Sequence, residues 1–458
     1  SPEPKRARSR RARTSRTFDA CAVGASAPRL EITAEPFAAV LSSKFRTERC
    51  DACFKSCKIS RCSACQYVYY CSRNCQRISW AMHKIECPNI KRVYPNELPD
   101  AVRMMARVII KLQNGKDEER GYYSSQEYRT FKDLMSHYCN IKQDMKKMEH
   151  FISVSAVLYE FLPHSMLPGP KELLEMFGRI SINSFNIQDL DMTSIGVGIY
   201  LGPSIIDHSC KPNAATVFDG TRLLVRSLQD IPSFDWSKVS IAYIDVLRSV
   251  EERREELQNS YYFRCYCDRC ENPEVAATAA ACPNKACTNP CLAGDSKCGE
   301  CGHELPAEFT DDLETVSADS LRYLEIMETN PNLEVCRMCL RQQERLLHPL
   351  NMLYVRMLDM ASVAATEAKL WDESEKYTTK LAQKYEYYHG DSHPLTGHVY
   401  LTLGYVLGHG KKPKQAFDVI RKALGIVKLG FGEDHPKMNE AERIADWIFD
   451  EHKRINGD

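Results

Sequence analysis

The fold is decided by a cysteine-rich stretch that reads Cys50-Asp-Ala-Cys53, Cys62-Ser-Ala-Cys65, Cys71-Ser-Arg-Asn-Cys75 and His83-Lys-Ile-Glu-Cys87. These are four close pairs of soft ligands, which is the number and spacing that two tetrahedral zinc sites require. So short a segment cannot bury enough apolar surface to fold alone, so we expect the metal to supply the folding energy. The stretch therefore predicts a structural zinc module that does no chemistry itself.

Counting alone does not decide how the four pairs combine. An interleaved arrangement would tie both ends of the segment together, whereas a sequential one would not. Interleaving gives two groups of four ligands: Cys50, Cys53, Cys71, Cys75 and Cys62, Cys65, His83, Cys87. Cys57 is left over, and we expect it to be a free thiol.

Length and charge exclude several classes of protein. The chain of 458 residues is long enough for two to four domains, and its 61 basic and 61 acidic residues create no global field for nucleic acid or membranes. Most of the 21 cysteines occur as short-spaced pairs. This favours zinc thiolates in a reducing compartment over secreted disulfides. We find no signal peptide and no run of eighteen apolar residues, so we expect a soluble protein.

A second cysteine set begins far from the first. Cys265-x-Cys267-x2-Cys270 supplies three ligands, one short of a tetrahedron, so the fourth must come from elsewhere. Cys210 is the best candidate. Zinc there would hold the sheet-rich middle of the chain against the cysteine-rich tail, and would bring Tyr261 and Phe263 near His208.

A further group of cysteines has a zinc-ribbon-like spacing, Cys282-x4-Cys287 with Cys298-x2-Cys301. Cys291 competes with Cys287 for one ligand position, and free thiols in a loop are the alternative to metal binding. Cys336 and Cys339 lie in a helical stretch, where core packing is expected.

Apolar periodicity predicts the order of elements. A strand is expected within residues 29–45, a linker over 88–99 and a helical stripe from Asp100 onward. Further helices are expected over residues 128–134, 145–161, 171–183 and 251–261. Short strands are expected over residues 195–206, 214–218, 222–227 and 239–244.

The chain is predicted to be helical from about Glu308 to its end, with an internal repeat. The segment Tyr388-His-Gly-Asp-Ser-His393-Pro394 recurs as Gly430-Phe-Gly-Glu-Asp-His435-Pro436, a period of 42 residues. Repeated helix pairs of this length predict a tetratricopeptide-like solenoid. We interpret each His-Pro pair as turn chemistry and not as a catalytic site.

Two motif sets now point to a family. The finger stretch, with Tyr70 before Cys71 and Trp80 before His83, closely resembles the MYND zinc finger. The middle of the chain resembles a SET domain with post-SET cysteines through the motifs Asn183-Ser-Phe-Asn, Gly196-Val-Gly198-Ile-Tyr, Asp207-His-Ser-Cys-Lys-Pro-Asn213, Tyr243-Ile-Asp and Cys265-x-Cys267-x2-Cys270. Over roughly residues 30–450 the chain thus resembles the SET-and-MYND-domain (SMYD) family of protein lysine methyltransferases.

The resemblance implies an α+β fold: a SET-type β-sheet domain with an inserted MYND zinc finger, a post-SET zinc region and a C-terminal α-helical tetratricopeptide-like domain. The expected divisions are a basic, disordered terminus (1–28), the N-terminal part of a split SET domain (29–49), the finger (50–87), a helical SET insertion (88–183), core SET (184–264), the post-SET and zinc-ribbon-like region (265–307) and the helical domain (308–458).

The resemblance also implies roles for single residues. Tyr243 matches the catalytic tyrosine. The S-adenosylmethionine site is implied to include Asn183, Asp207, His208, Tyr261, Phe263 and Tyr128. The substrate channel is implied to consist of Phe185, Tyr243 and Tyr261. The expected cofactors are S-adenosylmethionine and zinc, at three sites and the candidate fourth.

Three departures from the family pattern favour a rival interpretation. Asp207 replaces the usual asparagine, residues 232–238 replace a Gly-Glu-Glu turn, and residues 1–30 contain no glycine loop for the cofactor. The rival is a SET/MYND adaptor in transcriptional regulation with weakened or lost catalysis. A zinc-dependent DNA-binding regulator is a further, weaker alternative.

The resemblance implies partners and a location as well. Expected partners are lysine-bearing proteins, histone tails or others, and proline-rich peptides at the finger. Direct DNA binding, membrane binding and oligomerisation are not expected. The expected location is nucleus and cytoplasm, and the basic run within residues 5–16 could serve as a nuclear localisation signal.

Overall fold

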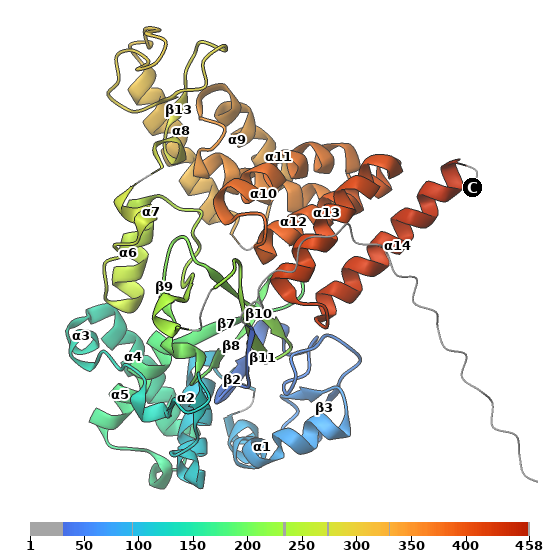
Figure 1. The fold of residues 1–458 in the computed structure, drawn as a ribbon. Coiled ribbons are helices and arrows are strands. Elements are labelled where there is room, and N and C mark those ends of the chain that lie inside the picture. Colours follow the sequence, from blue (N-terminus) through green and yellow to red (C-terminus); the bar gives the residue numbers. More distant parts are fainter. Residues whose placement is uncertain (1–30, 94, 232–234, 273, 329, 457–458) are drawn as a thin grey trace, which may run out of the picture.

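Figure 1 shows a computed structural model in which helices stand above and below a central group of strands. The structure describes residues 31–93, 95–231, 235–272, 274–328 and 330–456. The basic run within residues 5–16, and the whole of residues 1–30, where the cofactor's glycine loop would be expected, therefore lie outside the described residues. Within the described part of the chain, we find no helix whose length and apolar character would let it span a bilayer.

Short strands from distant parts of the sequence form the centre. One antiparallel sheet has the order β1-β11-β10 and a second has the order β2-β8-β7, while a third, parallel pair joins β9 to β12. Their bounds are β1 (Glu31–Ala34), β2 (Ala38–Leu41), β7 (Ser184–Gln188), β8 (Ser194–Ile199), β9 (Asp207–His208), β10 (Ala214–Asp219), β11 (Arg222–Ser227) and β12 (Ser240–Ile241). The strands before the finger thus pair with strands that follow it by more than 100 residues.

A glycine permits one of these close pairings. Gly196 of β8 pairs with Leu41 of β2, and a Cβ atom at Gly196 would lie 2.5 Å from the Val40 carbonyl oxygen. No larger residue fits there without moving the backbone of β2. The two halves of the split sheet therefore approach as closely as this glycine allows.

The finger consists of a short hairpin followed by one long helix. These elements are β3 (Ser60–Arg61), β4 (Tyr69–Tyr70) and α1 (Arg73–Val93). The predicted linker over residues 88–99 is wrong in its first half, because α1 continues through Pro88. The buried residues His83, Cys87 and Ile90 lie on this helix, so its packing outweighs the helix-breaking tendency of proline.

Helices between the finger and the core sheets cover one side of the molecule. Their bounds are α2 (Asp100–Lys111), α3 (Tyr138–Gln143), α4 (Met145–Phe161) and α5 (Pro170–Asn183). The helix predicted over residues 128–134 is wrong. That segment holds the end of a hairpin, β5 (Gly121–Tyr122) with β6 (Tyr128–Arg129), and then a single 3-10 turn. The segment is too short, and has too few apolar residues, for their spacing to distinguish a turn from a helix.

The core sheets continue into a charged helix and a cysteine-rich region. The elements are α6 (Val250–Tyr261), α7 (Asp268–Glu271), β13 (Ala280–Ala281) and β14 (Pro290–Cys291). Ser249 begins α6 with a capping box, since its side chain accepts from the Glu252 N–H and Glu252 accepts from the Ser249 N–H. This cap ends the loop that carries Tyr243 and directs α6 along the core.

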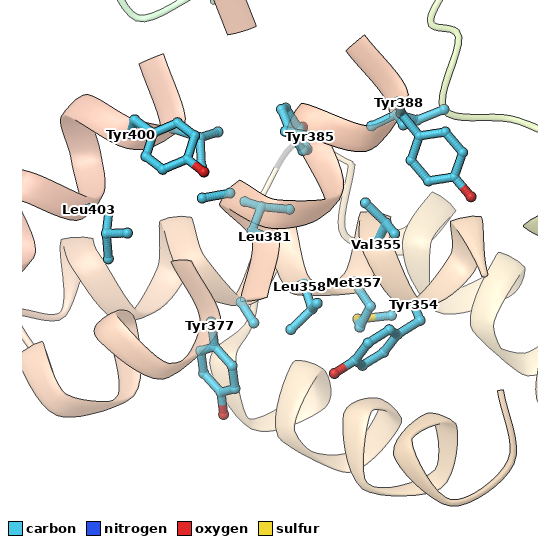
Figure 2. Close-up of a cluster of buried hydrophobic side chains, with 14 of the residues drawn as sticks. Tyr354, Val355, Met357, Leu358, Tyr377, Leu381, Tyr385, Tyr388, Tyr400 and Leu403 are labelled. Carbon is cyan, nitrogen blue, oxygen red and sulfur yellow. The ribbon is translucent and has the colours of Figure 1, made fainter. Parts of the chain in front are cut away.

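Antiparallel helices form the C-terminal part, as predicted. They are α8 (Phe309–Ile326), α9 (Leu333–Leu346), α10 (Met352–Glu367), α11 (Trp371–His389), α12 (Pro394–His409), α13 (Pro413–Phe431) and α14 (Pro436–Asn456). Figure 2 shows how residues such as Leu358 of α10, Leu381 of α11 and Leu403 of α12 form a shared core. Each helix buries its apolar face on its neighbours, which is how a solenoid gains stability.

The His-Pro pairs are turn elements, as predicted. His393 Nδ1 accepts the Leu395 N–H at 3.2 Å, and His435 Nδ1 accepts the Lys437 N–H at 3.1 Å, so each histidine caps the helix that follows. Since Nδ1 of His435 is an acceptor, Nε2 carries the proton and donates to the Phe218 carbonyl of β10 at 3.0 Å. The repeat therefore also fastens the helical domain to the core sheet.

Candidate active site

A large cavity lies where the central strands face the C-terminal helices. Its volume is about 1430 Å³. One wall comes from β7, β9, the loop after β12 and the end of α6, and the opposite wall comes from α8, α10, α11 and the start of α12. An ion pair between Arg356 and Glu252 at 3.5 Å joins the two walls. Beside the cavity, Arg226 Nε of β11 donates to the Leu429 carbonyl of α13 at 3.2 Å.

Tyr243 and His208 are fixed side by side in the first wall. The parallel pairing of β9 and β12 aligns Ile241 with His208, and the Tyr243 N–H donates to His208 Nδ1 at 3.1 Å. The Tyr243 hydroxyl donates to the Ile206 carbonyl at 2.5 Å. Its oxygen lone pairs thus remain available to a bound group. Burial, and then the nearby Asp207 and Tyr261, raises the pKa of Tyr243, so the phenol stays neutral.

His208 connects this wall to a cysteine group. Burial lowers the pKa of His208 to about 4, so the ring is neutral near pH 7. With Nδ1 accepting from Tyr243, the proton is on Nε2, which lies 3.2 Å from Cys210 Sγ. A thiolate at Cys210 would accept that proton as a hydrogen bond, so any metal held there also orients His208 and Tyr243.

Aromatic rings surround this position. Ring centroids lie 5.0 Å apart for Tyr243 and Tyr261, 5.3 Å for His208 and Tyr243, and 6.1 Å for His208 and Phe263. The Tyr261 hydroxyl donates to the Tyr243 carbonyl at 3.3 Å, which holds the end of α6 against the loop. Ring faces attract a cation that enters between them, so the arrangement suits an ammonium or sulfonium centre.

The cysteines next to this wall come together although Cys210 and Cys265 are 55 positions apart in the sequence. Ligand atoms of Cys210, Cys265, Cys267 and Cys270 all lie within 4.8 Å of one another, and the Cys210 and Cys270 sulfurs are 3.6 Å apart. Four thiolates around zinc at about 2.3 Å stand about 3.8 Å apart, so the group fits the ion. Arg253 Nη2 lies 3.8 Å from Cys270 Sγ and offsets part of the thiolate charge.

The finger ligands form two groups in the interleaved pattern. Cys50, Cys53, Cys71 and Cys75 make one group, and Cys62, Cys65, His83 and Cys87 make the other. Both fit tetrahedral zinc, with sulfurs 3.9 Å apart for Cys53 with Cys71 and for Cys62 with Cys87. The sequential arrangement that the sequence left open does not occur. Cys57 is exposed and belongs to neither group.

The predicted cofactor and channel residues lie mostly in one place. The cavity lining includes Asn183, Phe185, Asp207, His208, Tyr243, Tyr261 and Phe263. Tyr128 is not part of this lining among the described residues; its ring packs on Tyr122 at 5.6 Å and lies under Arg120 at 4.3 Å. Its neighbour Arg129 does line the cavity, because successive side chains on β6 point to opposite faces.

Two predicted residues have local neighbours that bear on their roles. Asn183 ends α5, and its side-chain amide nitrogen donates to the Arg179 carbonyl at 2.8 Å and to the Met135 carbonyl at 3.0 Å. Both bonds use the nitrogen of the amide and leave its oxygen unused. Asp207 is exposed at the edge of β9. The loop that replaces the Gly-Glu-Glu turn is described only from Asp235, which caps the 3-10 turn at Trp236–Lys238.

No sequence pattern predicted the second wall of the cavity. Asp359 of α10, with Tyr385 and His389 of α11, lines the cavity although it lies more than 100 residues after Tyr243 in the sequence. Burial raises the pKa of Asp359 to about 6, and burial lowers the pKa of His389 to about 3. No local motif marks these positions, because their place in the wall follows from how the helices dock.

Known proteins are similar to this chain in sequence. The MYND finger family model matches residues 50–87. Over 415 residues, 89% of each chain, the sequence is 29% identical to the human histone-lysine N-methyltransferase SMYD3. It is 27% identical to the Arabidopsis thaliana histone-lysine N-methyltransferase ASHR1 over 91% of each chain, and 25% identical to zebrafish (Danio rerio) N-lysine methyltransferase SMYD2-A over 89% of this chain and 90% of that one.

The chain is similar to the SMYD methyltransferases over about nine tenths of its length. The finger match, the alignment over most of each relative and the split sheet with inserted finger agree on this. The predicted α+β class is confirmed with it, including the helical C-terminal domain. The predicted zinc cofactor is confirmed at the level of several Cys/His clusters.

Proposed function

We propose that the protein is an S-adenosylmethionine-dependent protein-lysine N-methyltransferase. The observation that carries the proposal is the aromatic cluster of Tyr243, Tyr261 and Phe263, which shares a cavity wall with His208 beside a zinc-type cysteine group. Similarity over most of each chain to named lysine methyltransferases supports the same activity.

The aromatic and polar side chains of the cavity fit the charges of the cofactor. S-adenosylmethionine, when bound, supplies an activated methyl group on a sulfonium. The faces of Tyr261 and Phe263 would hold that positive centre, and Asn183, Asp207 and His208 are the polar groups at hand for its amino-acid end. The Asp207 carboxylate would attract the ammonium of that end but repel its carboxylate.

Tyr243 would orient the lysine amine. The reaction needs a neutral amine placed in line with the donor, and it needs little proton chemistry in the transition state. The phenol oxygen, held by the Ile206 carbonyl, would accept a hydrogen bond from the amine. Phe185, Tyr243 and Tyr261 would strip water from the lysine side chain, which favours its neutral form.

The helical wall suits a protein substrate. Seven carboxylates line the cavity against three guanidinium groups, so its field favours a cationic lysine; the carboxylates are Asp207, Asp245, Glu252, Glu256, Glu325, Glu328 and Asp359. The proposed division into domains follows the boundaries given above, with residues 308–458 as the far wall.

We further propose that the finger binds proline-rich peptides, that the protein acts as a monomer, and that it resides in nucleus and cytoplasm.

Asp207 favours a second candidate, an adaptor that retains the scaffold but not catalysis. Its exposed carboxylate stands where an asparagine amide is usual in the family, so a donor is lost and a repulsive charge is added at the cofactor's position. The adaptor and the enzyme differ in one measurable property, which is affinity for S-adenosylmethionine.

Calorimetric titration of the full chain with S-adenosylmethionine tests the proposal. The enzyme should give saturable heat and a higher melting temperature, since a ligand of the folded state stabilises it. Tyr243→Phe should then reduce methyl transfer to protein lysine by roughly a hundredfold or more, with cofactor affinity changed little.

Tyr266→Phe is the matched control, because Tyr266 is exposed and outside the cavity lining. It should leave turnover unchanged. The absence of heat and of thermal stabilisation at millimolar cofactor would favour the adaptor. Full activity in Tyr243→Phe would remove Tyr243 from the mechanism.

A further inference from the structure

We propose that Cys282, Cys287, Cys298 and Cys301 bind a fourth zinc ion, which holds the turn between α9 and α10 and thereby the far wall of the cavity. The site lies outside the finger and outside the Cys210 group. It goes beyond the proposed function, because neither the family model for the finger nor the catalytic argument involves these residues.

The four sulfurs already have the spacing of a metal site. All four ligand atoms lie within 4.8 Å of one another. The sulfurs are 3.6 Å apart for Cys282 with Cys301 and 3.8 Å for Cys287 with Cys298. The edge of a zinc–thiolate tetrahedron is about 3.8 Å, whereas a disulfide needs about 2.0 Å. These distances match those of the finger and of the Cys210 group.

The backbone provides an independent observation. In each Cys-x2-Cys unit of the finger, the residue after the second cysteine is left-handed and donates its N–H to the carbonyl of the first cysteine. Phe54 does so with φ 58° at 2.8 Å, and Gln66 with φ 57° at 3.0 Å. Gly302 repeats the same turn after Cys301, with φ 68° and a 3.0 Å bond to the Cys298 carbonyl.

The competition between Cys287 and Cys291 is resolved by position. Cys291 lies on β14, is fully buried, and directs its thiol towards the Asn289 carbonyl at 3.9 Å. It is outside the group of four, although it shares a hydrophobic core with the ligands Cys282 and Cys298. The Asn289 amide donates to Cys298 Sγ at 3.5 Å, a contact that favours a thiolate there.

The site is tied directly to the start of α10. The Ala279 carbonyl, just before β13, accepts from the His348 N–H and from the Asn351 side-chain amide, both at 3.0 Å. His348 Nδ1 accepts from the Leu350 N–H, so Nε2 carries the proton and donates to the Thr288 carbonyl at 3.1 Å. Thr288 follows the ligand Cys287 in the sequence.

This connection reaches the cavity through one helix. Asn351 is fully buried and caps α10 by accepting the Leu353 N–H at 3.0 Å. Further along α10, Arg356, Asp359 and Met360 line the cavity. Without zinc, the short strands β13 and β14 have only two residues each to hold this turn, which is too few for independent stability.

Zinc content of the intact full chain tests the proposal, measured by native mass spectrometry and by elemental analysis. Wild type should carry four zinc ions, and the double variant Cys298→Ser/Cys301→Ser should carry three. Cys291→Ser is the matched control and should keep all four. Three or fewer ions in wild type would overturn the site even if the double variant failed to fold, as would four in the double variant or a loss in Cys291→Ser.

Hydrogen exchange tests the second half of the proposal. Backbone amides of residues 347–353 should exchange at least tenfold faster in the double variant than in wild type, while those of the finger stay unchanged. Unchanged exchange at that turn after loss of the ion would show that the site does not hold α10. Neither readout uses methyl transfer, so failure here is distinct from failure of the proposed function.

Discussion

At the scale of single residues, the chemistry of the cavity depends on which wall each polar side chain comes from and on what holds it there. His208 lies on β9 and Tyr243 on the loop that follows its partner strand β12, and the Tyr243 N–H donates to His208 Nδ1, so the pairing of β9 with β12 sets their orientation. Asp359 comes from the opposite wall, is hydrogen-bonded to Tyr385 and has Asp245 nearby. It is a carboxyl that the fold holds in an unfavourable place for a charge.

The raised pKa of Asp359 gives a pH-dependent prediction. Its folded pKa is about 6, above the ordinary value of 3.8, so between these values the folded state binds more protons than the unfolded state. Stability is therefore lost as pH rises through this window. Asp359→Asn should stabilise the protein at pH 8 by up to about 3 kcal/mol, and the gain should shrink by about half at pH 5.

Calorimetric melting of both proteins at pH 8 and pH 5 measures this difference. Asp418→Asn, an exposed change on α13, serves as the control and should shift neither melting temperature. A gain for Asp359→Asn that is equal at both pH values would contradict the assignment, because it would show that the carboxyl does not titrate in this range.

At the scale of elements, a buried charge cluster joins the finger to α2. Asp51 lies between two zinc ligands, and it accepts from Arg103 at 2.6 Å and from Arg107 at 2.7 Å. Glu86, three residues after the ligand His83, accepts from Arg107 at 2.9 Å. Asp51 and Glu86 are almost fully buried, and burial alone would raise their pKa values, but the two guanidinium groups that face them hold both pKa values below the ordinary range.

We predict that Asp51→Asn destabilises the protein by about 3 kcal/mol, since it leaves buried guanidinium charge without its partner. Zinc content should not change, because no ligand is lost. Chemical denaturation and elemental analysis measure the two properties. Glu97→Gln, which removes an exposed partner of Arg46, should cost less than about 1 kcal/mol. A similar small cost for Asp51→Asn would mean that the cluster does not join the finger to α2.

At the scale of the whole molecule, the helical domain forms one wall of the cavity and also binds to two other parts of the chain. It closes the cavity opposite the SET motifs and is fastened to the core sheet at Phe218 and to the cysteine-rich region at Ala279. Figure 1 shows this domain, in orange and red, lying across the strands on the side away from α1. Access to the cavity therefore depends on how these helices dock.

Truncation gives the corresponding prediction. A chain that ends at residue 307 should lose the far wall and about one third of its length, so selection among protein substrates should weaken more than cofactor binding does. The finger groups and the Cys210 group should keep their zinc, because none of their ligands lies beyond Cys270. Elemental analysis and competition between protein substrates measure this. Loss of more than one zinc ion would contradict a separable domain.

Sequence patterns determined the spacing of the zinc ligands, the helix pattern of the C-terminal third and the resemblance to the SMYD family, because ligand spacing and apolar periodicity are local properties. Helices α4, α5 and α6 begin and end within one residue of the predicted bounds. Tertiary structure alone decided the interleaved pairing, the place of Tyr128 outside the cavity and the second wall with Asp359 and His389. These features depend on which distant segments pack together, and packing is a property of the whole chain that no short window of sequence contains.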